Sequence, residues 1–315
     1  MASLKKSGLA KLGLGRVGVR PACVTQAAFQ NAALVILLLA TCLSSAAFAQ
    51  TKFTETRKEY RFAVGPHANI SVDTQSGAIT VKPGNSNEVV VTAIIKSDNV
   101  EVDQQQNGNR IEIASHLLKG AEQQIGQVNY ELLIPLDASL TLHSTNGLLS
   151  AEHLQGDLDI EGGDTTVNVH NVENGHVHVQ TMRGVITVSD VRNGHVEIGS
   201  IGGDIHLKSV TGPLVQASSG SGKISYDGDF GSGGDYRFTT HSGSIEALVP
   251  ANVSADFKAH SVLGRVQHDF PLQARHYRYP ETGSSFFGTT GKAASEVVLR
   301  SFSGRIRLTQ RKTEN

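Results

Sequence analysis

The stretch Val177–Leu207 reads VHVQTMRGVITVSDVRNGHVEIGSIGGDIHL and contains one pattern twice. Apolar Val177 and Val179 alternate with polar residues, a glycine follows, and the alternation resumes at Ile186 and Val188. The same order returns from Val196 onward. A period of two places successive side chains on opposite faces of a β-strand. Each copy therefore predicts a strand, a glycine turn and a second strand.

The pattern extends over most of the chain, with one glycine as the anchor of each copy. The anchors are Gly77, Gly147, Gly184, Gly203, Gly222, Gly243, Gly264 and Gly304. Mostly apolar residues stand seven and five positions before each anchor, and two and four positions after it. Thr165 takes the anchor position in one further copy. From Gly147 the anchors are 18, 19, 19, 19, 21, 21 and then 40 residues apart, so the last gap predicts one unit plus an insertion.

A hydroxyl side chain stands three positions before every glycine anchor. These residues are Thr74, Ser144, Thr181, Ser200, Ser219, Thr240, Ser261 and Ser301. A Ser or Thr at a fixed turn position can bond the backbone of its own turn, and glycine can adopt a positive φ. Eight equivalent nucleophiles would have no chemical purpose, so the column predicts structural turns. If Gly203 occupies a turn with positive φ, Gly203→Val should destabilise the fold by roughly 1–3 kcal/mol.

Units of about 20 residues cannot bury an apolar face alone, so they stack on their neighbours. The sequence predicts an all-β fold, a right-handed-type β-solenoid with repeats of about 19–21 residues. A β-sandwich of consecutive hairpins is the alternative, but the near-constant spacing favours the solenoid. We expect a less regular N-terminal β cap over 50–135, the repeat domain over 136–310 with a loop insertion at 271–292, and a polar tail at 311–315.

Three segments carry a resemblance to a known family. They read YELLIPLDASLTLHSTNGLLSAEHLQGDLDI, TMRGVITVSDVRNGHVEI and SIGGDIHLKSVTGPLVQAS. They resemble the bacterial "putative adhesin" family of β-strand-repeat proteins, catalogued as a domain of unknown function. The entry motif of that family corresponds here to Ile134-Pro135, Leu140, Leu142 and Ser144, and then Asn146-Gly147. The resemblance covers nearly all of 60–310 and implies the fold, but it supplies no catalytic residues.

The first 49 residues have the composition of a signal peptide. Five basic residues and no acid precede the apolar run Ala32–Ala40, and Ala47-Phe48-Ala49 gives an A-x-A cleavage pattern. The apolar run is short for a membrane span, which needs about 20 residues. We therefore expect no membrane span after signal cleavage. Lipidation at Cys42, or an uncleaved anchor, is the alternative.

The composition after the leader limits the chemistry. Both cysteines, Cys23 and Cys42, lie in the leader, so the mature chain has no thiol for disulfides or catalysis. Its 23 basic and 29 acidic residues give a net charge of −6, which offers no electrostatic footprint for nucleic acid. We expect no cofactor.

These features predict an exported, non-enzymatic binding or scaffolding module of the periplasm or cell surface. Its partner would be an envelope protein or a polysaccharide, and self-association is possible because a solenoid end exposes unpaired backbone. The predicted insertion has four aromatic residues among Gly, Pro and Ser. This candidate contact loop contains Tyr277, Tyr279, Phe286 and Phe287.

Two chemical alternatives remain open. In the repeat frame, Asp159, His178 and Glu197 fall in one outward column on neighbouring coils, with His176 and His195 in the next column. Such a ladder could hold zinc or a similar ion, or it could be a solvated face of opposite charges. The other alternative is a polysaccharide lyase or hydrolase that uses two carboxylates as acid and base. The acids scatter through turns and outward columns, which favours the binding module.

Overall fold

The computed structural model describes residues 55–120, 126–274 and 282–311. The expected signal peptide, with Cys42, lies outside these residues, as do Tyr277 and Tyr279. Within the described ranges every regular element is a β-strand, so the prediction of an all-β solenoid is confirmed. The described residues belong to one compact unit within Phe53–Asn315. No helix in this part of the chain has the length and apolarity needed to cross a membrane.

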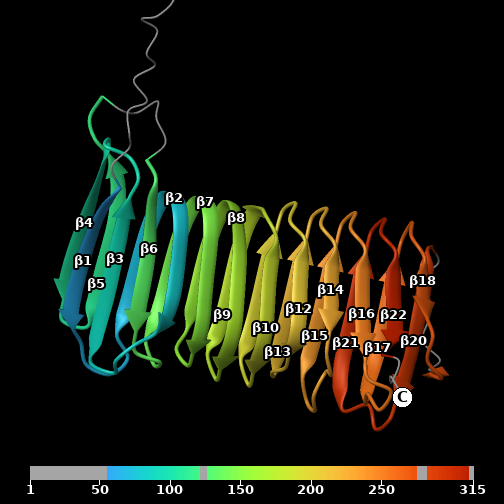
Figure 1. Cartoon of the computed structure of the whole chain (residues 1–315). Helices are drawn as coiled ribbons and strands as arrows, with labels where there is room; N and C mark the ends of the chain where they lie inside the picture. Colours follow the sequence, from blue (N-terminus) through green and yellow to red (C-terminus); the bar gives the residue numbers. More distant parts are fainter. Residues whose placement is uncertain (1–54, 121–125, 275–281, 312–315) are drawn as a thin grey trace, which may run out of the picture. The chain divides into compact units, whose positions relative to one another are not determined.

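The strands stack side by side along one axis (Figure 1). The strands of the N-terminal part are β1 (Thr56–Ala63), β2 (Asn69–Pro83), β3 (Glu88–Ile95), β4 (Val100–Asn107), β5 (Arg110–Leu117) and β6 (Val128–Ile134). The coils that follow are built from β7 (Ser139–Leu154), β8 (Leu158–Glu173), β9 (His176–Arg183), β10 (Ile186–Arg192), β11 (His195–Ser200), β12 (Ile205–Val210), β13 (Leu214–Ser219), β14 (Ile224–Asp227), β15 (Asp235–Thr240) and β16 (Ile245–Val249). The C-terminal part has β17 (Ala255–Ser261), β18 (Val266–His268), β19 (Gln273–Ala274), β20 (Ser284–Thr290), β21 (Ser295–Ser301) and β22 (Ile306–Gln310).

Each coil contributes one segment to each of two rows of parallel strands. The first row runs through the first halves of β2, β7 and β8, and then through β9, β11, β13 and β15. The second row runs through the second halves of β2, β7 and β8, and then through β10, β12, β14 and β16. The alternating apolar residues of both rows point inward. They form one continuous core, in which Ile160, Val179 and Val188 are fully buried.

The early coils pass from one row to the other without a break in the strand. Asn69–Val81 of β2 pairs with Ser139–Ala151 of β7, and Gly77 lies opposite Gly147. These two glycines have φ values of +138° and +146°, which side chains of L-residues rarely adopt. A bent, continuous strand therefore replaces the strand–turn–strand unit in this part of the stack.

The later coils contain a true turn, which the hydroxyl column holds. The Ser200 hydroxyl accepts the Gly203 N–H at 2.8 Å, and the Ser219 hydroxyl accepts the Gly222 N–H at 2.9 Å. Ser219 also donates to the Gly203 carbonyl of the neighbouring coil at 3.1 Å. Gly203 does not occupy the left-handed region, so positive φ is not the reason for glycine at this anchor. Glycine is needed there for a different reason: an added Cβ would lie 1.9 Å from the Gly184 carbonyl oxygen.

The N-terminal part closes the stack as a two-layered sandwich. β6, β3 and β1 continue the second row, with antiparallel pairing from β6 onward. β5 and β4 continue the first row and pair with each other in antiparallel orientation. β2 lies within the predicted cap but is a full coil, in register with β7.

The C-terminal coils do not stack in the order of the chain. β21 lies between β15 and β17, and β22 lies between β16 and β18. The last coil of the sequence is therefore inserted one place inside the end of the stack. The segment 271–292 was predicted as a loop, but its described residues form β19 and β20, and β20 pairs antiparallel with β17. This segment supplies the outermost strand of the first row, which satisfies backbone groups that a bare end would expose.

Candidate binding surface

The outward side chains of the first row form three columns that strand pairing holds in register. The outer column, farthest from the turns, contains Asp157, His176, His195, Leu214, Asp235 and Glu296. The middle column contains Asp159, His178, Glu197, Gln216 and Arg237. The turn-side column contains Gln180, Gly199, Ser218, Thr239, Arg300 and His260.

The structure brings the predicted His and acid ladder into one column. Asp159, His178 and Glu197 pair in register on β8, β9 and β11, and the His178 Nδ1 lies 3.8 Å from the Glu197 Oε2. The His176 and His195 rings meet edge to face at 5.6 Å. Among the residues that the structure describes, no three His, Cys, Asp or Glu side chains converge as a metal site would require. Side chains on adjacent strands of a row project in parallel, so register alone does not make them converge.

Two of the four predicted contact aromatics lie in the described residues, on β20 and not in a loop. The Phe286 ring lies 4.1 Å from the His268 ring and packs partly buried against the core. Its neighbour Phe287 is half-buried. Phe286 therefore helps to close the end of the stack, a structural role that the loop hypothesis did not include.

A hollow crosses the first row where two neighbouring coils have glycine in place of a larger side chain. Gly199 interrupts the turn-side column, and Gly220 lies at the turn of the next coil. Two adjoining hollows of about 420 and 530 Å³ result, and they share Ser218, Thr239 and Arg300 as lining residues. We call the two together the glycine hollow.

The turn-side part of the glycine hollow is aromatic and basic. The rings of His241 and Phe302 stack in parallel, with 4.9 Å between their centroids and 5° between their planes. Phe302 is 45% exposed although it is a large apolar residue. The basic side chains of His241, His260 and Arg300 line this part, and its lining contains no carboxylate.

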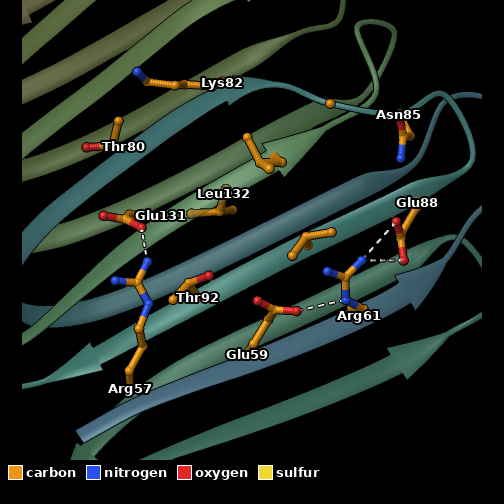
Figure 2. Close-up of a pocket in the computed structure, with 13 residues that line it drawn as sticks. Arg57, Glu59, Arg61, Thr80, Lys82, Asn85, Glu88, Thr92, Glu131 and Leu132 are labelled. Carbon is orange, nitrogen blue, oxygen red and sulfur yellow. Dashed lines mark hydrogen bonds and ion pairs between the residues drawn. The ribbon is translucent and has the colours of Figure 1, made fainter.

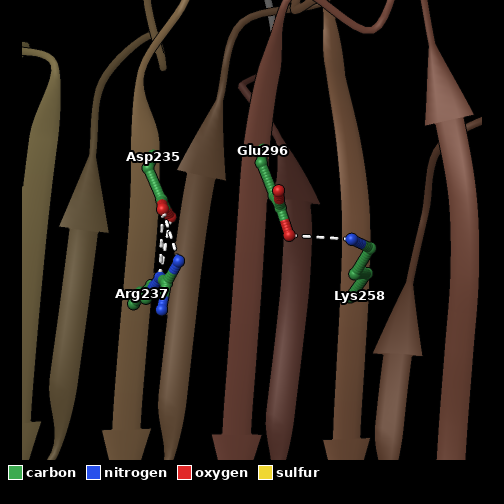
Figure 3. Close-up of polar contacts among 4 residues, drawn as sticks. All are labelled: Asp235, Arg237, Lys258 and Glu296. Atoms are coloured by element: carbon green, nitrogen blue, oxygen red, sulfur yellow. Dashed lines mark hydrogen bonds and ion pairs between the residues drawn. The ribbon is translucent and has the colours of Figure 1, made fainter.

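The sheet-side part of the glycine hollow is polar. Gln180, Gln216 and Glu197 line it together with Arg237. Arg237 is held by Asp235 on its own strand, with N–O distances between 2.6 and 3.1 Å, and this hydrogen-bonded pairing raises the pKa of the Arg237 guanidinium (Figure 3). Within the described part of the chain, no carboxylate pairs with Arg300. Arg300 is therefore the cation of this surface that is open to an added anion.

Two strands farther along the same surface, a second pair compensates its own charge. The Lys258 ammonium donates to the Glu296 carboxylate at 2.7 Å, between β17 and β21 (Figure 3). Like the Asp235–Arg237 pair, it occupies a solvated position where ion pairs contribute little to stability. Arg300, on β21, has no such carboxylate partner among the described residues.

A larger hollow of about 680 Å³ lies on the N-terminal sandwich, over β1, β3 and β6. Figure 2 shows that Arg57 and Arg61 point toward carboxylates: Arg57 reaches Glu131 at 2.7 Å, and Arg61 reaches Glu59 at 2.8 Å and Glu88 at 3.2 Å. These hydrogen bonds raise the pKa of Arg61. Because its charges neutralise each other, this hollow offers a charged ligand less than the glycine hollow does.

The sequence patterns singled out His178 and Glu197, which line the sheet-side part of the glycine hollow, but not Gly199, Gly220, Arg300 or Phe302. Gly199 and Gly220 could have been found by following the outward columns, where glycine replaces larger residues. Arg300 and Phe302 could not, because they reach Thr239 and His241 only through the inserted last coil.

The architecture is that of an all-β protein built from stacked repeats. A family model described as Toastrack DUF4097 matches residues 67–309. This chain belongs to that family, and the resemblance indicated by the repeat motifs is confirmed. No curated protein matches the chain.

Several solved structures are similar to the chain at low identity. One is described as a "putative adhesin" from Bacteroides fragilis, with 14% identity, 81% of this chain and 98% of that chain covered, and a TM-score of 0.39. A second "putative adhesin", from Parabacteroides merdae, has 12% identity, covers 82% and 97%, and has a TM-score of 0.34. A "putative cell adhesion protein" from Clostridium sporogenes has 12% identity, 81% and 100% coverage and a TM-score of 0.30.

Proposed function

We propose that this protein is an exported, non-enzymatic binding or scaffolding module of the cell envelope, and that it contacts its partner through the outer surface of the first row. The observation that carries the proposal is the glycine hollow. It brings Gln180, Gln216 and Arg300, whose side chains have no hydrogen-bond or ion-pair partner among the described residues, together with an exposed aromatic pair, on strands that are paired on both sides.

The stack makes this surface rigid before any partner arrives. Every first-row strand under the hollow, from β9 to β21, has a paired neighbour on each side. The fully buried residues Val179, Phe238 and Leu299 fix these strands from below. A surface held by packed strands loses little conformational entropy on binding, which favours recognition over catalysis by moving parts.

The proposed location rests on the leader at residues 1–49. Export would leave a mature chain without cysteine, whose stability comes from packing and backbone pairing alone. The fold fits this condition, because one core runs through all the described coils. Cleavage after Ala49 is tested by N-terminal sequencing of the protein recovered from the periplasm and medium. A chain that keeps its leader, or that stays in the cytoplasm, would contradict export.

The partner is tested by capture from the envelope fraction with the tagged mature protein, with and without a chelator. The first-row variant Gln216→Ala/Arg237→Ala is compared with the second-row variant Ser225→Ala/Glu246→Ala, whose residues lie on the outer side of β14 and β16. We expect a polysaccharide or protein partner that is insensitive to chelation and is lost only in the first-row variant. Loss in the second-row variant alone would contradict the proposed surface.

Two results of the same experiment would support the alternatives. Capture that requires metal would favour the ladder of Asp159, His178 and Glu197, and a His178→Ala variant would then lose it. Shortening of a captured polysaccharide during incubation would favour a lyase or hydrolase. Either result would contradict a non-enzymatic, metal-independent module.

A further inference from the structure

We infer that the glycine hollow binds an acidic oligosaccharide, with the sugar ring against Phe302 and His241 and its carboxylate on Arg300. This inference rests on the proposed function, since it names the ligand class for the same surface. Shape, the aromatic pair, charge and hydrogen-bonding capacity each support it independently.

The shape comes from missing side chains, not from a bend in the backbone. Gly199 lies on β11 between Gln180 and Ser218, and its position could hold a side chain: an added Cβ would lie 3.7 Å from the nearest atoms of both neighbours. The glycine is therefore not required by packing at this position. Its absent side chain leaves room for a ligand on the surface.

The aromatic pair supplies the flat apolar face that a sugar ring needs. His241 and Phe302 lie in register on neighbouring turns and stack almost parallel, at 5°. A pyranose ring presents C–H groups on its faces and hydroxyls at its rim. A flat aromatic side chain contacts such a face while the polar rim stays accessible to hydrogen-bonding groups.

The charge selects an acidic sugar. Arg300 stands in the turn-side column between Thr239 and His260, and it pairs with no carboxylate of the described residues. The lining of this part of the hollow has no acid that would repel an anion. A guanidinium recognises a carboxylate through two parallel hydrogen bonds, which fixes the orientation as well as the charge of the ligand.

The remaining polar groups match sugar hydroxyls. The side-chain amides of Gln180 and Gln216 make no hydrogen bond within the part of the chain described, so their donors and acceptors are open to a ligand. Hydroxyls at Ser218 and Thr239 lie between them and Arg300. A side-chain amide has both a hydrogen-bond donor and an acceptor, and so has a sugar hydroxyl. One amide can therefore donate to one hydroxyl of a sugar ring and accept from its neighbour.

The pairing of the strands disfavours a peptide as the occupant. An extended peptide usually binds a sheet by adding a strand to a free edge, where backbone groups are unpaired. β11, β13, β15 and β21 are paired on both sides, so the hollow presents side chains only. A ligand here must be recognised through its faces and substituents, as a saccharide is.

The test measures binding of the mature protein to acidic oligosaccharides by calorimetry. The probes are oligogalacturonate, a glucuronate-containing oligosaccharide and a sialylated oligosaccharide, with a neutral glucose oligomer and poly-glutamate as comparisons. We expect at least one acidic oligosaccharide to bind, and both comparisons to bind at least tenfold more weakly. Arg300→Gln and Phe302→Ala should each weaken binding at least tenfold.

The decisive variant fills the hollow without disturbing the fold. Gly199→Gln extends the column begun by Gln180 and should abolish binding while leaving the midpoint of thermal unfolding unchanged. The matched control is Gly202→Ser, on the adjacent turn, where the nearest atoms to an added Cβ would be side-chain atoms at 3.6 Å, an ordinary contact distance. This control should bind like the wild type.

Three results would overturn the inference: no binding of any acidic oligosaccharide, equal binding of poly-glutamate, or full binding by both Gly199→Gln and Arg300→Gln. Its failure is distinguishable from failure of the proposed function. If Gly199→Gln still captures the envelope partner, the binding module stands and the hollow is not its site. If the wild type captures nothing, the proposed function itself fails.

Discussion

The turns of the early coils and the turns of the later coils share the same sequence columns but not the same geometry. At Gly77 and Gly147 the strand bends and continues, φ is positive, and the hydroxyl three positions earlier donates to a backbone carbonyl of its own bend, as Ser144 does to Asn146 at 3.2 Å. From Gly203 onward φ at the anchor is not positive, and the hydroxyl accepts the glycine N–H, as Ser219 does from Gly222. Gly184, in the turn between β9 and β10, still has a φ of +105°.

The comparison shows which requirement fixes the glycine. In both kinds of turn an added Cβ would collide with the backbone of the neighbouring coil: 1.9 Å from the Gly77 oxygen at Gly147, and 1.9 Å from the Gly203 oxygen at Gly222. Close stacking is therefore the common cause, and positive φ is an additional demand at Gly77, Gly147 and Gly184. The close contact between neighbouring coils therefore recurs at the anchors, whereas the backbone conformation of the anchor differs from one coil to another.

The largest expected effect is at these stacked glycines. Gly222→Ala should lower the free energy of unfolding by about 3 kcal/mol or more, because the backbone must shift to relieve the contact. Gly147→Ala should lose more, since it adds backbone strain at φ +146°. Chemical denaturation measures both. Gly202→Ala is the control and should stay within about 0.5 kcal/mol. Equal losses at Gly222 and Gly202 would break the close-stacking account.

The next largest effect is expected at alkaline pH, where the buried tyrosines of the N-terminal sandwich and of the coils should contribute differently to the free energy of unfolding. Burial raises the pKa of Tyr130, in the N-terminal sandwich, to about 12, that of Tyr236, in the coils, to about 12, and that of Tyr226 above its ordinary range. Below pH 10, the ordinary tyrosine pKa, both states keep these protons and this contribution is complete. Above pH 10 the unfolded chain ionises first. Stability should therefore fall by about 1.4 kcal/mol per pH unit for each buried tyrosine until its folded pKa is reached.

The measurement is the free energy of unfolding between pH 9.5 and 11.5. Tyr226→Phe/Tyr236→Phe should flatten the slope about twice as much as Tyr130→Phe, whatever the variants lose at neutral pH. Tyr226 donates hydrogen bonds to the Asp229 and Val210 carbonyls, so a loss at neutral pH is expected for its variant. An unchanged slope in the double variant would show that these tyrosines do not govern the alkaline limit.

A smaller effect distinguishes the two roles of the hydroxyl column. Ser219→Ala removes two hydrogen bonds and leaves the Gly222 N–H without its acceptor, so it should cost about 1–3 kcal/mol. Ser144→Ala removes a single bond and should cost about 1 kcal/mol. Both side chains are buried, which makes the pair a matched comparison for urea denaturation. If Ser144→Ala costs more than Ser219→Ala, the two kinds of turn do not differ as described.

The smallest effect is expected at the surface ion pairs of both regions. Asp235→Asn in the coils and Glu131→Gln in the N-terminal sandwich break exposed pairs with Arg237 and Arg57. Each should change the free energy of unfolding by less than about 0.5 kcal/mol at moderate salt. A loss above 1 kcal/mol in either region, seen in the same denaturation assay, would mean that its surface charges support the stack.

Much of this fold was predictable because its signal is local. Alternation, anchor spacing and the hydroxyl column gave the coils, and the pairing of Asp159, His178 and Glu197 followed from the same frame. The stacking order at the C-terminal end was not predictable, since every coil offers the same apolar pattern to either neighbour. The glycine hollow depends on that order through Arg300, so it could not be located from the chain sequence.

The sequence patterns did not predict a second regularity, although its residues carry a signal. Asn171, Asp190 and Ser209, on successive coils, have φ values between +53° and +56°, and His153 precedes them with +57°. Asn and Asp tolerate this left-handed conformation better than other residues with side chains. The backbone bends at these residues, and the residues that follow Asn171, Asp190 and Ser209 point into the core. These are Val172, Val191 and Val210. A search for recurring Asn or Asp would have found part of this column.

The inserted last coil constrains how the molecule can be assembled. A chain that emerges from its N-terminus can add coils one after another as far as β16. β17 and β18 then lack a parallel neighbour until the last strands of the sequence are made. β21 inserts between β15 and β17, and β22 inserts between β16 and β18. The two rows are therefore complete only after the last strands have formed. A chain that ended before Ser295 would lack β21 and β22, and the strands on both sides of their places would keep unpaired edges. β21 and β22 thus join the preceding coils to the last one, so the stack forms fully only in a chain that includes them.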